Sequence, residues 1–181
     1  MSQCAAPRIV LGLGANIGAP RRQLLAAVAA LSRELGPLTV APLYRSAAVS
    51  PIAQPEFLNT VVLARSDWQP ERLLALAKDL EAQAGRVEGP RWGPRPLDVD
   101  LLLVGELRHD DVALTLPHPR LRERGFVLAP LADIAPDLRL PPRHPDHPDH
   151  PDGRTAADML AALPREAWPV RVPWTADEHG R

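Results

Sequence analysis

The sequence contains little cysteine, few aromatic residues and no excess charge of either sign. Cys4 is the only cysteine among 181 residues, which excludes an internal disulfide and favours a reducing, intracellular compartment. The 21 basic and 22 acidic residues give a net charge of −1, so no global field attracts nucleic acid or an anionic membrane. The apolar run at 9–15 is too short for a membrane span or a signal sequence. We therefore expect a cytoplasmic protein with neither nucleic acid nor a membrane as partner.

The rest of the composition is that of an ordinary globular protein. Hydrophobic residues make up 45% and charged residues 24% of a chain whose length suits one domain. We expect a single domain over 1–181, with a core at about 8–173. The sequence has no long apolar stripe that would need a partner subunit, which favours a monomer.

A low-complexity loop is expected at 141–153, where the triplet His-Pro-Asp occurs three times in succession. Proline at every third position excludes a helix. In a polyproline II strand, histidines three residues apart stand about 9 Å apart, which is too far for two imidazoles to share one zinc ion. We therefore interpret the repeat as a solvated loop and not as a metal site.

The hydrophobic pattern predicts alternating strands and helices in the first two thirds of the chain. Apolar residues recur at helical spacing between proline starts and glycine stops, and short β-branched runs lie between them. The predicted order is strand 8–14, helix 20–35, strand 38–45, strand 57–64, helix 70–84 and strand 97–104. This β-α-β-β-α-β order is that of a ferredoxin-like α+β fold, an antiparallel sheet with both helices on one face and the other face open to a ligand. The shorter pieces that follow are interpreted as C-terminal elaborations.

Two aspartates begin the last of these strands. Asp98 and Asp100 are two residues apart, so both carboxylates lie on one face of the strand, while Val99, Leu101 and Leu103 lie on the other. At about 7 Å two ionised carboxylates repel each other, and a bridging divalent cation relieves the repulsion and supplies charge for a phosphate. Taken alone, such a pair also fits a solvated sheet face with no ligand.

Three arginines surround this pair and strengthen the phosphate interpretation. Arg86, Arg91 and Arg95 lie just before the aspartates, the last two in a loop rich in glycine and proline. Guanidinium groups beside metal-binding carboxylates suit a polyphosphate with its magnesium. The chain has no G-x-x-x-x-G-K-[ST] motif, so arginines have to hold the phosphates in place of a P-loop.

The stretch RWGPRPLDVDLLL resembles the signature of the 6-hydroxymethyl-7,8-dihydropterin pyrophosphokinase family: a basic residue, then x-G-P-R-x-x-D-[LIV]-D and aliphatic residues. The resemblance continues in LGLGANIG, LYRSAAV, QPEFLN, LEAQAGR and LPHPRLRERGFVLAPLADIAPD, and covers roughly 8–141. It implies an enzyme of folate biosynthesis that transfers the terminal pyrophosphoryl group of ATP to the hydroxymethyl oxygen of the reduced pterin, leaves AMP, and uses two Mg²⁺ ions.

The resemblance also implies roles for single residues. The catalytic positions are Arg86, Arg95, Asp98 and Asp100, of which the two aspartates hold both metal ions. The ATP-binding positions are Glu81, Arg91, Trp92, Thr115, His118 and Arg124. The pterin-binding positions are Ser46, Val49, Phe57, Asn59 and Phe126, with the amide of Asn59 reading the edge of the ring between the two phenylalanines. Two aromatic faces and one amide suit a flat ring with a donor-and-acceptor rim, although phenylalanines are also ordinary core residues.

The chain departs from the family pattern at two loops. Val87-Glu88-Gly89-Pro90 stands where basic residues are common, so we expect Arg86 and Arg91 to carry more of the phosphate binding. Ser46-Ala47-Ala48-Val49 replaces a segment richer in proline, which leaves the shape of the pterin loop open.

Two other functions compete with this interpretation. A catalytically silent ferredoxin-like binding module is disfavoured by the seven aromatic residues of the chain and the lack of an aromatic RNA-binding motif. A two-metal nucleotidyltransferase would use the aspartates in the same way. A nucleotidyltransferase would not explain why Phe57, Asn59 and Phe126 occur together in this chain.

Overall fold

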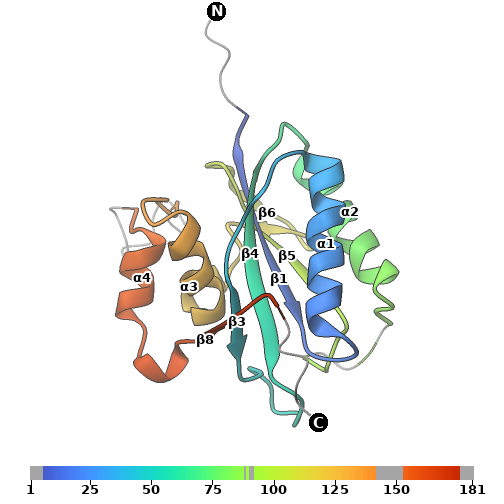
Figure 1. Ribbon diagram of the computed structural model, residues 1–181. Coiled ribbons are helices and arrows are strands. Elements are labelled where there is room, and N and C mark those ends of the chain that lie inside the picture. The colour runs from blue at the N-terminus through green and yellow to red at the C-terminus, as the bar shows by residue number, and fades with distance from the viewer. Residues whose placement is uncertain (1–5, 88, 90–91, 142–152, 176–181) are drawn as a thin grey trace, which may run out of the picture.

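The computed structural model describes residues 6–87, 89, 92–141 and 153–175 as an antiparallel sheet with helices on both sides (Figure 1). The strands of the larger sheet are β1 (Arg8–Ala15), β2 (Thr39–Val40), β3 (Leu43–Ser46), β4 (Phe57–Arg65), β5 (Asp98–Val104) and β8 (Val170–Val172). They are ordered β5-β1-β4-β3-β8, with β2 also paired to β4. The helices are α1 (Pro20–Leu35), α2 (Pro70–Gln83), α3 (Gly125–Ile134) and α4 (Ala156–Ala162). The expected mixture of helices with an antiparallel sheet is confirmed.

Proline and glycine set the limits of the first two helices, as the sequence predicted. Pro20 and Pro70 occupy the first turns, where a missing N–H costs no helical hydrogen bond. Gly36 ends α1 with a φ of 82°, and Gly85 follows α2 with a φ of 84°, a backbone region that favours glycine. Both helices therefore present their predicted apolar stripes to the sheet.

The predicted strand 38–45 is interrupted at Pro42. Thr39 pairs with Leu63 in β2, whereas Tyr44 pairs with Asn59 in β3, so the register against β4 shifts by one residue between them. Proline has no N–H to donate to the ladder, which explains the break at this position. The shorter strand β3 continues to Ser46 and brings this residue next to the end of β4.

Two apolar clusters lie on opposite faces of the sheet. In β1, Ile9 and Leu11 belong to the cluster with α1 and α2, whereas Val10 belongs to the cluster with α3 and α4. The expectation of a second face open to a ligand therefore holds only in part. The C-terminal helices cover one region of that face and leave the rest accessible (Figure 1).

A bulge in β5 changes which face its last residues contact. Leu101 pairs with Leu11 and Leu103 pairs with Val10, so Leu102 has no partner of its own on β1. Leu102 and Leu103 both pack in the cluster with α3 and α4. The prediction that Leu103 faces the other way was wrong, because an extra residue in one strand shifts the alternation of side chains.

The C-terminal segment returns to the sheet. Thr155 caps α4 in a reciprocal capping box with Asp158, and β8 then pairs with β3 as an edge strand. A small hairpin of β6 (His109–Asp110) and β7 (Thr115–Leu116) and the turns η1 (Leu121–Glu123) and η2 (Arg165–Ala167) complete the described elements. None of the helices in the described ranges combines the length and the apolar character needed to cross a membrane. Cys4 and the His-Pro-Asp repeat lie outside these ranges.

Candidate active site

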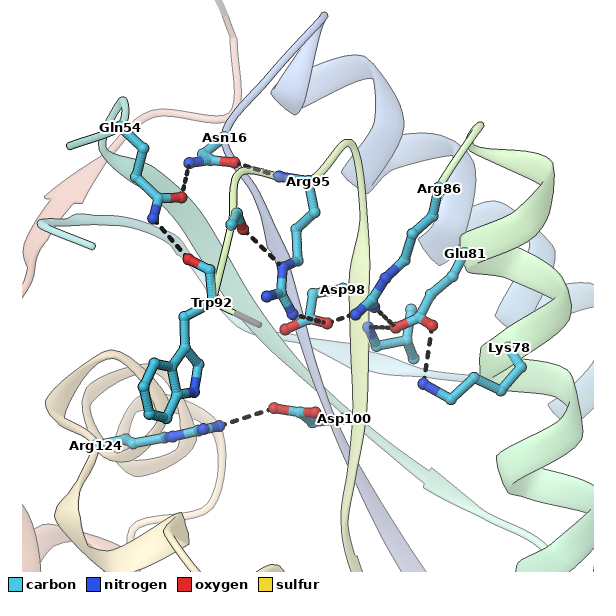
Figure 2. Close-up of polar contacts among 12 residues, drawn as sticks. Asn16, Gln54, Lys78, Glu81, Arg86, Trp92, Arg95, Asp98, Asp100 and Arg124 are labelled. Carbon is cyan, nitrogen blue, oxygen red and sulfur yellow. Dashed lines mark hydrogen bonds and ion pairs between the residues drawn. The ribbon is translucent and has the colours of Figure 1, made fainter. Parts of the chain in front are cut away.

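A pocket lies on the accessible part of the second face, between the sheet and the start of α3. Its lining includes ten of the residues predicted from the sequence: Ser46, Val49, Phe57, Asn59, Trp92, Arg95, Asp98, Asp100, Arg124 and Phe126. They come from β3, β4, β5, α3 and the loops between them, so residues far apart in the sequence meet here. Figure 2 shows five of them: Trp92, Arg95, Asp98, Asp100 and Arg124. The predicted Arg91 lies outside the described residues.

Asp98 is bound by two arginines through one oxygen. Its Oδ1 accepts hydrogen bonds from Arg86 Nη1 at 2.6 Å and from Arg95 Nη1 at 2.9 Å (Figure 2). Burial alone would raise the pKa of the Asp98 carboxyl, but the charges and hydrogen bonds of Arg95 and Arg86 outweigh burial and hold this pKa below its usual range. Asp98 is therefore ionised at neutral pH.

Asp100 is bound from the other side of the pocket. Arg124 Nη1 donates to its Oδ2 at 2.8 Å, and Arg124 directly precedes α3. Within the described ranges, Asp98 Oδ2 and Asp100 Oδ1 accept no hydrogen bond. Each carboxylate of the pair therefore keeps one oxygen for a further ligand.

Glu81 lies behind the pocket and not in its lining. Only 3% of this residue is exposed. Its Oε1 accepts the backbone N–H of Val99 at 2.9 Å and also binds Arg86, while its Oε2 accepts from Lys78 Nζ at 2.9 Å. A buried carboxylate with three donors is well satisfied. Glu81 thus joins α2 to β5 and orients Arg86 toward Asp98.

His118 and Thr115, two predicted nucleotide positions, also lie outside the lining. Thr115 Oγ1 donates to Asp110 in the small hairpin at 3.2 Å. His118 Nδ1 accepts the backbone N–H of Arg120 at 3.1 Å. Burial lowers the pKa of His118 and the charge of Asp100 only partly offsets this effect, so the ring is neutral at physiological pH and carries its proton on Nε2.

The predicted pterin end combines an amide, a hydroxyl and two aromatic rings. Asn59 is 5% exposed, and its Nδ2 donates to Ser46 Oγ at 3.0 Å. Phe57 and Phe126 both line the same pocket. The amide is therefore fixed in orientation by the neighbouring strand, with an aromatic side chain from each of β4 and α3 nearby.

Two glycines of β1 form the floor of the pocket and were not singled out from the sequence. Gly14 pairs with Asn59 on one side and with Asp98 on the other, and Gly12 pairs with Asp100. A Cβ on Gly14 would lie 3.1 Å from Asn59 Oδ1. The repeated glycine in LGLGA was a signal for this close approach.

A hydrogen-bond network joins three loops above the pocket, and sequence reasoning missed it. Asn16, which is 4% exposed, accepts the backbone N–H of Arg95 at 2.8 Å and donates to Gln54 Oε1 at 2.9 Å. Gln54 Nε2 in turn donates to the Trp92 carbonyl at 2.8 Å (Figure 2). The φ of Trp92 is 65°, a region that few residues other than glycine adopt. The network therefore fixes the loop that carries both Trp92 and Arg95.

Comparison with known proteins identifies the family. The model of the family 7,8-dihydro-6-hydroxymethylpterin-pyrophosphokinase matches residues 10–136. The chain belongs to this family. The resemblance noted in the sequence is thereby confirmed. Members of the family transfer pyrophosphate from ATP to 6-hydroxymethyl-7,8-dihydropterin in folate synthesis, and this chain is such a pyrophosphokinase.

Similar proteins agree with this family membership. The 2-amino-4-hydroxy-6-hydroxymethyldihydropteridine pyrophosphokinase of Pseudomonas aeruginosa is 43% identical over 161 residues, which are 88% of this chain and 93% of that protein. The protein of the same name from Synechocystis is 38% identical over 165 residues, 89% of this chain and 79% of its own. A crystal structure of Plasmodium falciparum HPPK-DHPS with pteroate has a TM-score of 0.60 at 13% identity. The match covers 89% of this chain but only 44% of that longer one, and it supports the fold alone.

Proposed function

We propose that this pocket is where the chain transfers pyrophosphate from ATP to the pterin, with Asp98 and Asp100 holding Mg²⁺ against the triphosphate. The observation that carries the proposal is that Asp98 and Asp100 of β5 line the same pocket as Asn59, Phe57 and Phe126, with β1 between Asp98 and Asn59. The aspartates and their arginines have the chemistry of a polyphosphate site, and the amide with the two aromatic rings has that of a site for a flat, hydrogen-bonding ring. ATP is the co-substrate of this family.

The donor set fits magnesium. Mg²⁺ prefers oxygen ligands and is usually bound by one or two carboxylates together with substrate phosphates. Asp98 and Asp100 lie on the same face of β5, and each keeps one oxygen that the described residues do not occupy. No group of three or more possible metal-binding side chains occurs in the described part of the chain, so phosphates and water have to complete the coordination. Bound magnesium would supply positive charge to the polyphosphate.

The arginines of the site are placed to bind phosphates on both sides of the aspartates. Arg95 and Arg86 contact Asp98, and Arg124 contacts Asp100 from the start of α3. We assign Trp92, together with Arg91, to the nucleotide. The remaining predicted nucleotide positions, Glu81, Thr115 and His118, do not line the pocket. In the proposal they support the nucleotide site from outside the lining.

The pterin end of the proposal places the ring between the two phenylalanines. The side chain of Asn59 has both a donor and an acceptor, so its amide can read the edge of the ring. Ser46 fixes this amide, and Val49, which is 62% exposed, lies at the pocket beside it. The hydroxymethyl group then points toward the aspartates.

The reaction itself needs alignment more than acid–base chemistry. A bond forms between the hydroxymethyl oxygen and the β-phosphorus of ATP, and the bond from this phosphorus to the α–β bridging oxygen breaks, so that AMP leaves and the hydroxyl proton is released to water. Phosphoryl transfer of this kind is accelerated mainly by positioning and by neutralising charge. The residues of the pocket supply both, because the loops that carry Arg95 and Trp92 are joined by the Asn16 and Gln54 amides.

Three further expectations belong to the proposal. The strand order β5-β1-β4-β3 with α1 and α2 on one face supports a ferredoxin-like arrangement. The chain is proposed to act as a monomer, and to do so in the cytoplasm.

A product assay tests the proposed function. The protein is incubated with ATP, Mg²⁺ and 6-hydroxymethyl-7,8-dihydropterin, and the nucleotides are separated by chromatography. We expect AMP in equal amount to the pterin diphosphate. Formation of ADP, or release of free pyrophosphate with nucleotide transfer, would overturn the proposal, and unchanged ATP would favour a silent binding module.

A further inference from the structure

In the part of the chain that the structure describes, three arginines line the pocket, and one of them is not engaged with an aspartate. Arg95 and Arg124 are hydrogen-bonded to Asp98 and Asp100 at 2.9 and 2.8 Å. For Arg120, the nearest carboxylate partner in the described part of the chain is Glu123, whose Oε2 lies 4.0 Å from Nε. This distance is at the limit of an ion pair, and both side chains are substantially exposed, so the contact contributes little.

The backbone at Arg120 is held by hydrogen bonds, whereas among the described residues its guanidinium group makes only the long contact with Glu123. Its N–H donates to His118 Nδ1, and the next N–H, that of Leu121, donates to the His118 carbonyl at 3.0 Å. His118 N–H donates in turn to the Leu102 carbonyl of β5 at 2.9 Å, and Leu121 is fully buried. Arg120, a residue of the pocket lining, is therefore attached to the sheet through a rigid turn.

The charge of the pocket lining points to a role for this side chain. Among the described lining residues, three arginines and two aspartates leave one positive charge that neither aspartate binds, and Arg120 carries it. A guanidinium group matches phosphate oxygens with two parallel N–H donors, and it binds them most strongly where no carboxylate competes.

We propose that Arg120 binds the diphosphate group that is transferred, first as part of ATP and then as part of the pterin product. The inference rests on the proposed function, because it assigns Arg120 to the same pocket. It adds a phosphate-binding residue to those that the sequence predicted. Arg120 thus distinguishes ligands that carry the transferred diphosphate from ligands that lack it.

Binding measurements with four ligands test this role. The full chain and its Arg120→Gln variant are titrated calorimetrically, in the presence of Mg²⁺, with α,β-methylene-ATP, AMP, the pterin diphosphate and 6-hydroxymethylpterin. We expect the affinity for the first and third ligands to fall about tenfold to hundredfold in the variant, because each loses a charged hydrogen-bond donor. The affinities for AMP and hydroxymethylpterin, which lack the transferred diphosphate, should stay within about twofold.

Two further variants control the experiment. Arg33→Gln removes the same charge from the exposed last turn of α1, and it should leave all four affinities unchanged. Arg120→Lys keeps the charge but loses the two-pronged donor, so it should restore part of the lost affinity.

The outcomes separate this inference from the proposed function. If wild-type protein binds neither α,β-methylene-ATP nor hydroxymethylpterin, the proposed function fails. If wild-type binding is normal and Arg120→Gln weakens all four ligands equally, or weakens none of them, Arg120 has no phosphate role and only the inference fails. Equal losses of affinity in Arg33→Gln and Arg120→Gln would show that Arg120 acts only through the net charge of the protein, and the inference would fail.

Discussion

The two faces of the sheet use the same strands for different purposes. The face toward α1 and α2 is mostly apolar, and Val99 and Leu101 of β5 are buried there. On the other face, Asp98 and Asp100 of the same strand open into a pocket, and apolar packing resumes only at Leu102. Neighbouring residues of one strand therefore serve either the core or the site, depending on which side they point to.

This difference shows how the fold accommodates a polar site without losing its core. The α1 and α2 face and the α3 and α4 region bury the large apolar side chains. The pocket end of the second face has glycines in β1 where large residues would otherwise pack. Stability and chemistry should therefore be separable by mutation.

The largest expected effect is a loss of catalytic rate when a carboxylate charge is removed from the pocket side of β5. In Asp98→Asn the side chain keeps its shape but loses the charge that holds Arg86 and Arg95 and would bind magnesium. We expect AMP formation to fall on the order of 10²–10³-fold, as for the loss of a charge-stabilising group elsewhere. Initial rates measure the loss. Asp79→Asn, on the exposed side of α2, is the matched control and should retain full activity. A rate within a few fold of wild type in Asp98→Asn would remove this residue from the site.

A smaller effect is expected from filling the floor of the pocket. In Gly14→Ala the added Cβ lies 3.1 Å from Asn59 Oδ1 and 3.7 Å from Phe57, so the amide that we propose binds the pterin has to move. We expect the KM for the pterin to rise by about tenfold, while the KM for ATP changes less. Steady-state kinetics with each substrate varied in turn measures the two constants.

The matched control for the pocket glycine is Gly36→Ala. Gly36 has a φ of 82°, and a methyl group added there would meet no atom of the described residues within 4 Å, so the substitution strains the backbone far from the pocket. It should lower the free energy of unfolding by about 1 kcal/mol and leave both KM values unchanged. Parallel increases of both KM values in Gly14→Ala would show a general loss of structure and not a local one.

A hydrogen bond that joins the sheet to α3 should contribute moderately to the stability of the fold. Tyr44 of β3 donates its hydroxyl hydrogen to Asp133 Oδ2 of α3 at 2.8 Å. Burial, together with this hydrogen bond, raises the pKa of Tyr44 to about 12. We expect Tyr44→Phe to cost about 1–2 kcal/mol in the free energy of unfolding, measured by urea denaturation.

The pH dependence provides a check on the same contact. Because the folded-state pKa of Tyr44 lies above its unfolded value near 10, the stabilisation is fully present below pH 10 and is lost as pH rises toward 12. Tyr44→Phe should lack this alkaline loss. An identical alkaline decline in both proteins would assign it to another group.

The smallest effect concerns acid stability. The pKa of Asp98 is lower in the folded than in the unfolded protein, so its contribution is present above the usual value of 3.8 and is lost as pH falls through the folded pKa. Melting temperatures between pH 6 and pH 3 should therefore decline more for wild type than for Asp98→Asn. Parallel curves would show that the arginine contacts contribute no stability.

The sequence predicted the helices and the orientation of the aspartates because both depend on local rules. Pro20, Pro70 and the glycines after each helix set limits that tertiary contacts did not override, and the period of two in a strand placed both carboxylates on one face. The interruption at Pro42 and the bulge at Leu102 were missed, because they depend on the register of the neighbouring strands.

The candidate site was predicted in its residue types but not in its contacts. The pairing of Arg124 with Asp100, across 24 positions, depends on how α3 packs on the sheet. The network of Asn16 and Gln54 joins loops 38 positions apart and has no local pattern. The hydrogen-bond partners of these polar side chains are set by the tertiary structure, which a local sequence pattern does not reveal.

The central claim is that at the start of β5 the residues that face the pocket serve catalysis and those that face α1 and α2 serve stability, and adjacent residues test it most directly. Asp100→Asn and Leu101→Ala are compared in parallel for AMP formation per folded molecule and for the free energy of unfolding. Asp100→Asn should lose on the order of 10²–10³-fold in rate with little change in stability. Leu101→Ala should lose about 2–5 kcal/mol in stability with a nearly normal rate. A nearly normal rate in Asp100→Asn, or a loss of rate in Leu101→Ala as large as in Asp100→Asn, would contradict the claim.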